Sequence, residues 1–390
     1  MEEMQYPPIL AEVRQFANQA IRPFAARFDA EERIPRELID QMAERGYLAA
    51  SFPEEYGGLG LDPVAYGLFT AEIGKACSST RALLTVHTSL VGETLLRWGT
   101  DEQKNRLLPA MARGEKLAAF ALSEPGAGSD ARSIQTRYHR QGDHFILNGR
   151  KKWITLSGIA DLFLVIATDG KQTTAFLVDR EGGGITTTPI RGLLGNRAVH
   201  VAEIDFRDVA VPARNVLGQE GTGFMYIVNT ALDFGRYSVA WGGLGIAQEA
   251  LEAMVAYSRS RKQFGEKIYK YQLIQGMIGD AVTKIHAARA LCLHAGRLRR
   301  EKHNDAAIET NIAKYYTSTI AGQIASDAVQ VHGANGCCGQ YPAERLFREA
   351  KILEIIEGTS QIQQEIIARF GLRRYYPAER ALSEAENALK

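Results

Sequence analysis

The sequence predicts an α+β protein of three domains, with helices at both ends of the chain and strands in the middle. The chain has 390 residues and 45% hydrophobic content, and single cores stop growing at roughly 250–300 residues. Apolar spacing is helical on both sides of a stretch of short β-rich runs. We therefore predict an N-terminal helical domain over residues 1–115, a middle antiparallel β-barrel or sandwich over 116–224, a C-terminal helical bundle over 225–375 and a polar tail over 376–390.

The N-terminal region carries signals for helices and for their ends. Leu38, Ile39 and Met42 have the spacing of one helix face, and Gly46 is a suitable stop. Residues 100–103 (TDEQ) resemble a helix start with acidic residues in the first turn. The glycine-rich stretch FPEEYGGLG then serves as a connection between helices.

The middle region changes to short β-rich runs without helices between them. Turn residues such as Asp169-Gly170 separate these runs, which is typical of antiparallel sheets. The runs that we expect to form strands are Phe145–Leu147, Leu162–Thr168, Thr173–Val178 and Val199–Phe206.

The C-terminal region returns to helical spacing. Leu244, Ala247, Leu251, Met254 and Ser258 fall on one helix face. A longer series with near-i+4 spacing ends at a glycine, which predicts a long helix with a glycine stop. Its residues are Ile308, Ile312, Tyr316, Ile320, Ile324, Ala328 and Val331, followed by Gly333.

Composition disfavours several classes of function. The chain has 46 Lys+Arg against 45 Asp+Glu, a balance that argues against nucleic-acid binding and against binding to anionic membranes. No window approaches the ~18 uninterrupted apolar residues of a membrane span. Four cysteines without CxxC spacing and eight histidines without ligand spacing predict no metal site and no disulfide framework. Reduced thiols and the lack of a targeting pattern favour a cytoplasmic protein.

Several common motifs of catalysis and cofactor binding are missing. Gly243 and Gly245 resemble part of a dinucleotide fingerprint, but Gln248 stands where the third glycine belongs. We find no P-loop, HExxH or GxSxG sequence. Redox chemistry in this chain would therefore need an organic cofactor.

Four segments have the residue types of a cofactor site, each with a structural alternative. Residues 121–130 (ALSEPGAGSD) could approach a phosphate or flavin ring closely, or form a polar turn. Residues 152–155 (KWIT) could form a stacking wall, or contribute a core tryptophan. Residues 259–265 (RSRKQFG) with Gln272 could hold a pyrophosphate, or form a solvated helix face. Residues 330–336 (QVHGANG) could pass close to a ligand, or only cap a helix.

Glu357 is the strongest candidate for a catalytic base. It lies in the segment EIIEGTSQIQ, where Gly358 should stop one helix and Ser360 with Gln363 should form the capping box of the next. A carboxylate at the negative end of a helix macrodipole should have a raised pKa, as a general base requires. Glu354 is expected to be solvated or ion-paired.

Taken together and in order, these segments resemble the acyl-CoA dehydrogenase family along nearly the whole chain. The matching stretches are FPEEYGGLG, ALSEPGAGSD, KKWIT, VPARNVLGQEGTGF, RKQFGEKI and EIIEGTSQIQ. The resemblance implies a helical domain, a β-domain and a C-terminal four-helix bundle, with FAD as cofactor and usually a homotetramer.

The resemblance also implies a set of site residues. The flavin of the same subunit would be lined by Phe120, Leu122, Ser123, Gly128, Ser129, Trp153 and Thr155. The FAD of a neighbouring subunit would be reached by Arg261, Gln263, Phe264, Gln272, Gln330, Val331, Gly333 and Ala334. Thr359 and Gln361 would hold the adenosine end, and substrate would meet Ser129, Arg236 and Gly358.

The chemistry implied by the resemblance is α,β-dehydrogenation of an acyl thioester. Glu357 would take the α-proton, flavin N5 would accept the β-hydride, and the Glu357 N–H would donate to the thioester carbonyl. Some relatives carry the base just before the arginine equivalent to Arg236, where this chain has Gly235. After Thr155 the family often has Asn-Gly, whereas this chain has Leu156-Ser157.

Two further stretches resemble the branch that acts on carrier-protein-tethered substrates in natural-product biosynthesis: CSSTR at 77–81 and FGRYSVAWG at 234–242. Acyl-CoA and a phosphopantetheine-bound acyl carrier protein therefore both stay open as substrates. An electron-transferring flavoprotein and oxygen both stay open as electron acceptors. The alternative functions are an acyl- or aminoacyl-carrier-protein oxidase that uses oxygen, which the presence of Glu357 favours over a monooxygenase, and a flavin-bearing partner protein without turnover.

Overall fold

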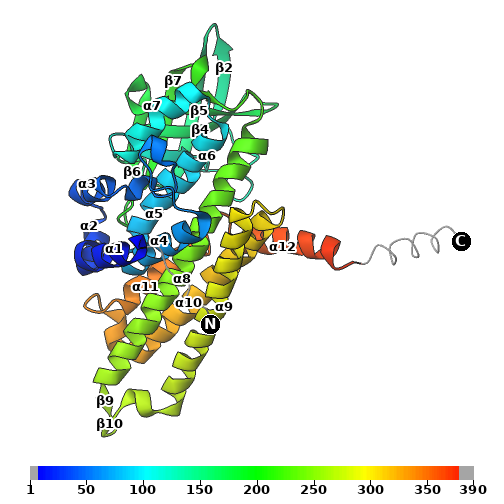
Figure 1. Cartoon of the computed structure of the whole chain (residues 1–390). Coiled ribbons are helices and arrows are strands. Elements are labelled where there is room, and N and C mark those ends of the chain that lie inside the picture. The colour runs from blue at the N-terminus through cyan, green and yellow to red at the C-terminus, as the bar shows by residue number, and fades with distance from the viewer. Residues whose placement is uncertain (1–7, 377–390) are drawn as a thin grey trace, which may run out of the picture.

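The computed structural model describes residues 8–376, and Figure 1 shows them as three regions that follow one another along the chain. The N-terminal helices lie beside the sheet, and the long C-terminal helices extend away from it to a small hairpin. Residues 1–7 and 377–390, which include nearly all of the expected polar tail, lie outside the described residues. No helix of the described part has both the length and the apolar character needed to cross a membrane.

The N-terminal region is helical, as expected. Leu38, Ile39 and Met42 are buried on one helix, and Gly46 follows its end with a positive φ of 72°. Thr100 and Gln103 form a reciprocal capping box at the last helix of the region. The helices are α1 (Ile9–Phe16), α2 (Ala25–Glu31), α3 (Arg36–Glu44), α4 (Pro63–Ala76), α5 (Ser78–Leu84), α6 (Glu93–Trp98) and α7 (Asp101–Ala112), with the π-helical segment η5 (Thr85–Gly92) joining α5 to α6.

The middle region forms one sheet of eight strands in the path β6-β7-β3-β2-β4-β5-β8, with β1 paired to β4. The expected strand at Leu162–Thr168 is confirmed to the residue as β4, and its seven side chains are buried. The strands are β1 (Ala118–Ala121), β2 (Arg137–Gln141), β3 (His144–Ile154), β4 (Leu162–Thr168), β5 (Thr173–Asp179), β6 (Ile185–Pro189), β7 (Ala202–Pro212) and β8 (Val216–Leu217).

The expectation of a purely antiparallel sheet is wrong at its centre. Strands β1 and β2 both run parallel to β4, whereas the remaining pairs are antiparallel. Parallel neighbours need a long crossover connection, and about forty residues separate β1 from β4 along the chain. The close spacing of the other strands indicated hairpins, but it carried no information about this crossover.

The C-terminal region is a bundle in which α8, α9, α10 and α11 pack together, which confirms the expected four-helix bundle. The predicted apolar face of α10 is buried at Ile320, Ile324 and Ala328, and the helix ends at Gly333. The elements are α8 (Asn229–Ser260), β9 (Lys262–Gln263), β10 (Glu266–Lys267), α9 (Gln272–Arg300), α10 (Ala306–His332), α11 (Ala343–Leu353) and α12 (Ser360–Arg374).

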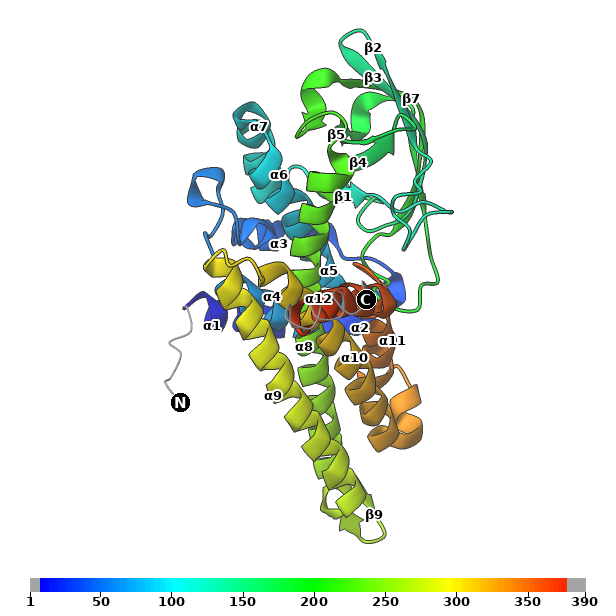
Figure 2. The same cartoon turned by 90° about the vertical axis from the view of Figure 1, so that its right-hand side faces the viewer.

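Segment η5 joins the three regions, because it packs against β1 on one side and against α8 on another. His87 fixes the first contact: its Nδ1 accepts a hydrogen bond from the Ala118 N–H at 3.1 Å, and its Nε2 bonds to the Met111 carbonyl. Burial lowers the pKa of His87 to about 4, so the ring is neutral at pH 7. Figure 2 shows α5 and α8 running side by side below the sheet.

Candidate active site

Glu357 lies in the loop between α11 and α12. Helix α11 ends at Leu353, so the expected helix stop at Gly358 is wrong, and Glu357 itself has a left-handed φ of 55°. Left-handed backbone is costly for a residue with a side chain, and it persists where surrounding contacts fix it. Two such contacts reach the Glu357 carbonyl oxygen: Arg236 Nε donates at 3.0 Å and Gln363 Nε2 at 3.1 Å. Lys314 Nζ donates to the next carbonyl, that of Gly358, at 2.7 Å.

The start of α12 differs from the expected capping box. Thr359, not Ser360, is the N-cap residue, and its hydroxyl accepts from the Ile362 N–H at 3.3 Å. The Gln363 side chain donates to carbonyl oxygens of the Glu357 loop and not back to the cap, because those carbonyls lie within its reach. Glu354 forms an ion pair with Lys351, as expected.

The Glu357 carboxylate has an environment suited to a base. Its Oε2 is buried and has no hydrogen-bond partner among the described residues. A Cβ on Gly235 would lie 2.6 Å from this oxygen, so the glycine makes room for the carboxylate. Burial raises the pKa of Glu357 to about 7, whereas the cations Arg236, Lys314 and Arg81 act in the opposite direction. The raised pKa that we expected is confirmed in direction, but burial and not a helix macrodipole causes it.

A buried ion pair between Lys151 and Glu124 holds the segment that carries Phe120, Leu122 and Ser123. Lys151 Nζ donates to the Leu122 carbonyl at 2.9 Å and to Glu124 Oε1 at 2.8 Å. Burial raises the pKa of the Glu124 carboxyl, but Lys151 and the hydrogen bonds lower it overall, so the carboxylate is ionised at pH 7. This anchor holds the end of β1 against β3.

Beyond this anchor the segment forms an exposed turn. Glu124 and Ala127 pair across it, and Gly126, Gly128 and Ser129 face solvent. A Cβ added at Gly126 or Gly128 would meet no atom of the described residues within 4 Å. Crowding among the described residues therefore does not require either glycine, and the open space would let a ligand ring approach the backbone closely.

Trp153 lies in the irregular end of β3, and Thr155 follows in the turn after this strand. Trp153 has a left-handed φ of 64° and its side chain is 54% exposed. Lys152 Nζ lies over the indole ring, 4.9 Å from its centroid, and the exposed remainder of the indole surface is open to stacking. Leu156, at the position where the resemblance led us to expect asparagine, also adopts a left-handed φ of 66°. Its N–H donates to the Val199 carbonyl at 3.0 Å and its side chain is fully buried, contacts that offset the backbone strain. The loop geometry is thus the one that Asn would favour, without Asn.

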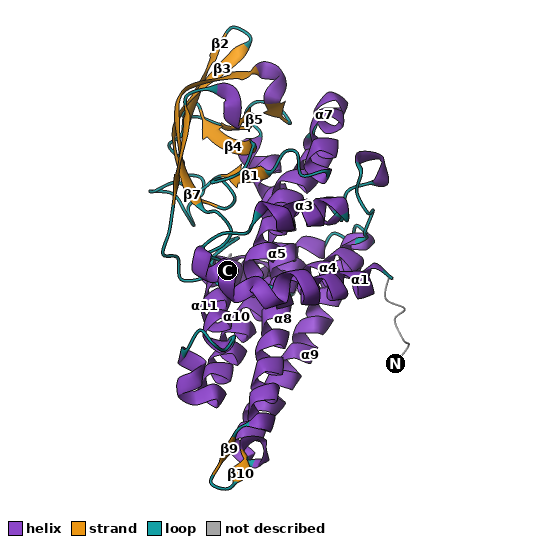
Figure 3. Cartoon of the chain, turned by 90° about the vertical axis from the view of Figure 1, so that its left-hand side faces the viewer, coloured by secondary structure: helices purple, strands orange, loops and turns teal. Residues whose placement is uncertain are grey.

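The residues expected to reach a neighbouring subunit lie at the far end of the bundle from the sheet, as Figure 3 shows for β9 and β10. Gln263, Phe264 and Gln272 line a hollow of about 730 Å³ there, and the Phe264 side chain is 95% exposed. Asn335 Nδ2 donates to the Tyr257 hydroxyl at 2.9 Å, which joins the glycine-rich end of α10 to the end of α8. The expected residues from this region are Arg261, Gln263, Phe264, Gln272, Gln330, Val331, Gly333 and Ala334, of which Val331 is buried.

These residues do not meet the sheet-side residues within one chain. One chain therefore supplies two separate parts of the expected cofactor site. Thr359 and Gln361 stand at the start of α12, and the Thr359 hydroxyl is already used as a cap acceptor.

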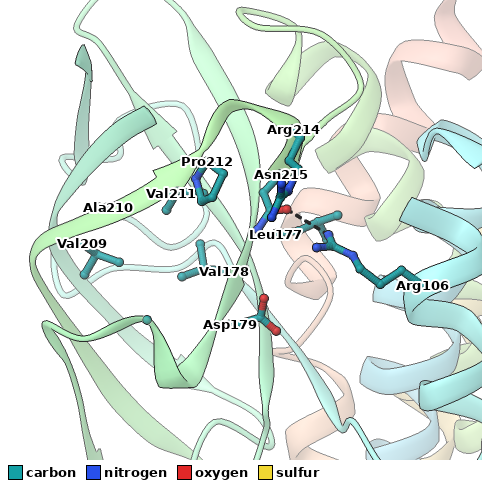
Figure 4. A pocket seen from close by; sticks show the side chains of 11 residues that line it. Arg106, Leu177, Val178, Asp179, Val209, Ala210, Val211, Pro212, Arg214 and Asn215 are labelled. Carbon is teal, nitrogen blue, oxygen red and sulfur yellow. Dashed lines mark hydrogen bonds between the residues drawn. The ribbon is translucent and has the colours of Figure 1, made fainter. Parts of the chain in front are cut away.

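The residues on the sheet side fit a flavin. Trp153 offers an exposed aromatic face, the turn at Gly126 and Gly128 has open space for a close approach, and Glu357 directs an unpartnered oxygen beside Gly235. A second hollow, about 260 Å³, lies between the sheet and α7 (Figure 4). Arg106 Nη2 donates to Asn215 Oδ1 at 2.9 Å there, and none of its lining residues belongs to the expected site.

Sequence reasoning missed the residues that support the site from behind. Lys314 lies on α10 away from the apolar face on which we based that helix, so the periodicity gave no signal for it. Lys151 and Glu124 both fell inside segments that we singled out, but nothing in their spacing indicated that they pair. Only contacts between distant parts of the chain identify them.

The comparisons with known proteins agree with this arrangement. Family models for the N-terminal, middle and C-terminal domains of acyl-CoA dehydrogenases match residues 7–115, 119–209 and 221–372. The short-chain specific acyl-CoA dehydrogenase of Clostridium acetobutylicum is 38% identical over 361 residues, which cover 91% of this chain and 95% of that protein.

Solved structures are similar over the same extent. Butyryl-CoA dehydrogenase from Megasphaera elsdenii superposes with a TM-score of 0.90 at 35% identity, covering 93% of this chain and 97% of the other. The prolyl acyl carrier protein oxidase AnaB gives 0.88 at 31%, with coverage of 93% and 97%. The chain is an oxidoreductase that belongs to the acyl-CoA dehydrogenase family, whose members are flavoproteins.

Proposed function

We propose that this protein is an FAD-dependent dehydrogenase that removes two hydrogens from the α- and β-carbons of an acyl thioester. The observation that supports this most directly is the Glu357 carboxylate, whose buried Oε2 has no partner within residues 8–376 and whose pKa is raised to about 7 by burial. A base with this pKa is half ionised at neutral pH, where general-base catalysis is most efficient. Glu357 takes the α-proton, and the bound flavin supplies the acceptor for the hydride that leaves the β-carbon.

The backbone of the same loop supports the substrate. Among residues 8–376 the Glu357 N–H donates to no other residue, so it is free for the thioester carbonyl oxygen. A hydrogen bond there acidifies the α-hydrogen, because it stabilises negative charge on the carbonyl oxygen as the proton leaves. Arg236, Gly358 and Ser129 are proposed substrate contacts. Arg236 acts mainly as a positioning residue, since its guanidinium holds the Glu357 carbonyl and Asn311.

FAD would be held by residues of two subunits. The flavin ring would contact Phe120, Leu122, Ser123, Gly128, Ser129, Trp153 and Thr155 of one chain. The residues at the far end of the bundle, together with Thr359 and Gln361, would hold the remainder of an FAD bound to a neighbour, in a homotetramer. The separation of the two sets within one chain supports this division, as does the exposed Phe264. A cytoplasmic location stays a prediction.

Mixing two inactive variants tests the shared site. Trp153→Ala and Arg261→Ala chains, each inactive alone, should form mixed assemblies in which some sites contain both wild-type halves. Recovery of a fraction of activity after dissociation and reassociation is expected. Mixtures that stay inactive although mass analysis detects mixed oligomers would place the whole site within one chain.

The central experiment is anaerobic addition of acyl-CoAs to the purified yellow protein. Bleaching of the flavin band, lost in Glu357→Gln, is the expected result. Protein that binds no flavin would contradict the proposal.

The similarity to AnaB favours a second candidate, an oxidase that acts on a carrier-protein-bound acyl group and passes electrons to oxygen. Bleaching only by acyl carrier protein thioesters, with rapid oxygen consumption on aeration, would identify it. Transfer to an electron-transferring flavoprotein with slow reaction toward oxygen would identify the dehydrogenase.

A further inference from the structure

Arg81 on α5 is a fully buried cation without a carboxylate partner. Its exposed fraction is 0%, and no carboxylate oxygen among the described residues lies within 4.0 Å of its guanidinium. Only Nη1 has a partner, the Thr85 hydroxyl at 2.8 Å, whereas Nε and Nη2 have none in the described part of the chain. An arginine that is buried unpaired is rare, because desolvation of its charge is offset only by good partners.

The unpartnered atoms of Arg81 have the arrangement that binds a carboxylate. Nε and Nη2 form one edge of the planar guanidinium, and their two N–H groups match the two oxygens of a carboxylate in a bidentate pair. The opposite side of the group is fixed, because Thr85 Oγ1 is also hydrogen-bonded to Ser238 on α8 at 2.7 Å. The guanidinium is thus oriented by the protein while its fork edge lacks a partner.

The carboxylates nearest to Arg81 do not satisfy it. Glu349 is bonded to Arg345 at 3.0 Å. Among charged groups, Glu357 has the largest electrostatic effect on the pKa of Arg81, but it makes no hydrogen bond or ion pair with it. Burial lowers the pKa of Arg81 to about 10, so the group stays charged at pH 7.

Helix α8 places Arg81 and Glu357 on the same side. Gly235, Ser238 and Gly242 follow one another at i, i+3 and i+7 along this helix, the spacing of one face. A Cβ on Gly235 would lie 2.6 Å from Glu357 Oε2, and a Cβ on Gly242 would lie 2.7 Å from Arg81 Nε. Two glycines therefore make room for the two charged groups. Seven residues of helix separate them by about 10.5 Å along the axis.

We propose that the acyl group oxidised by this protein ends in a carboxylate and that Arg81 binds this carboxylate. The inference rests on the proposed function, because it takes Glu357 as the base at the α-carbon. If the substrate carboxylate lies roughly 3 Å from Arg81 and the α-carbon roughly 3 Å from Glu357, the rest of the distance between the two residues must be spanned by the acyl chain. It fits a short dicarboxylic acyl thioester of about four to six carbons. Arg81 then selects the substrate, and the bound carboxylate supplies the partner that the chain lacks.

Binding measurements on a variant without the base test the selection of a carboxylate substrate independently of turnover. In flavin-loaded protein carrying Glu357→Gln, calorimetric titration should compare glutaryl-CoA with pentanoyl-CoA, which have equal chain length. We expect tighter binding of glutaryl-CoA by roughly 10- to 100-fold, the usual value of a hydrogen-bonded ion pair. Adding Arg81→Met should abolish the preference, and Arg81→Lys should retain part of it. Arg106→Met, which removes an arginine that contacts Asn215, is the matched control and should leave the preference unchanged.

The melting temperature of the Arg81 variant and flavin bleaching by the wild type distinguish the remaining outcomes. Replacing an unpaired buried cation by methionine should leave the melting temperature unchanged or raise it. A lowered melting temperature with an unchanged ratio of affinities would show that Arg81 is structural and would overturn the inference. Equal binding of both ligands by wild-type Arg81 would overturn it as well, while flavin bleaching by pentanoyl-CoA in protein with Glu357 would still support a dehydrogenase. If no thioester of either kind binds or bleaches the flavin, the proposed function fails.

Discussion

Replacing Glu357 by Gln should abolish activity and at the same time stabilise the protein, by an amount that grows with pH. Glutamine has the shape of a protonated glutamate and never ionises. The pKa of Glu357 rises from an ordinary 4.5 to about 7 in the folded protein, chiefly because of burial. The folded state therefore disfavours the ionised carboxylate, so Glu357 costs stability once the pH exceeds its unfolded pKa of 4.5.

The size of this stabilisation follows from the pKa shift of Glu357. At 1.36 kcal/mol per unit, the cost of Glu357 should be about 1 kcal/mol at pH 5 and should approach about 3 kcal/mol at pH 8. Denaturation of flavin-loaded wild type and Glu357→Gln at both pH values, at one protein concentration, measures the difference. A stabilisation that is the same at pH 5 and pH 8 would refute the reasoning, as would a variant less stable than wild type at pH 8. Glu354→Gln, at an ion-paired position on the same loop, is the control.

Three further predictions concern the same site. Because the base acts in its ionised form, kcat/KM should fall as the pH decreases through about 7, and a profile flat from pH 6 to 8 would exclude Glu357 as the titrating group. Gly235→Ala should lower kcat roughly 10- to 100-fold by displacing the carboxylate, with FAD affinity unchanged; Gly276→Ala, where a Cβ meets nothing within 4 Å, should have no effect. Lys151→Met leaves Glu124 buried and unpaired, which should cost about 3–5 kcal/mol and release FAD, and adding Glu124→Leu should recover stability in urea unfolding; no recovery would mean that Lys151 acts through packing alone.

The sequence was most informative where a single element carries the signal. Strand β4 was predicted to the residue because seven consecutive apolar or β-branched positions stand between clear turn signals. The end of α10 followed from the periodic series and from Gly333. The parallel placement of β1 against β4 could not be predicted in this way, because it depends on a crossover of about forty residues and not on local spacing.

The base illustrates the same limit at the level of one residue. Glu357 was proposed as the base from the segment around it, and the predicted direction of its pKa shift is confirmed. Its left-handed backbone could not be predicted, because the contacts that fix it come from Arg236 on α8 and Lys314 on α10, far away along the chain. Leu156 shows the converse: the resemblance led us to expect Asn there, yet a buried leucine is held in a left-handed conformation.

The cations around Glu357 raise a question, since three positive charges should weaken a base by favouring its ionised form. The hydrogen bonds of these cations show why the carboxylate still has a raised pKa. Arg236 and Lys314 donate to the carbonyl oxygens of Glu357 and Gly358, not to the carboxylate, and Arg81 makes no contact with it. Their charge therefore offsets part of the desolvation that raises the pKa, while Oε2 has no hydrogen-bond partner in the part of the chain that the structure describes. Because these cations belong to α5, α8 and α10, the pKa of Glu357 depends on how three helices pack as well as on the burial of its own loop. Substitutions that shift these helices should change the pKa of Glu357 without touching it.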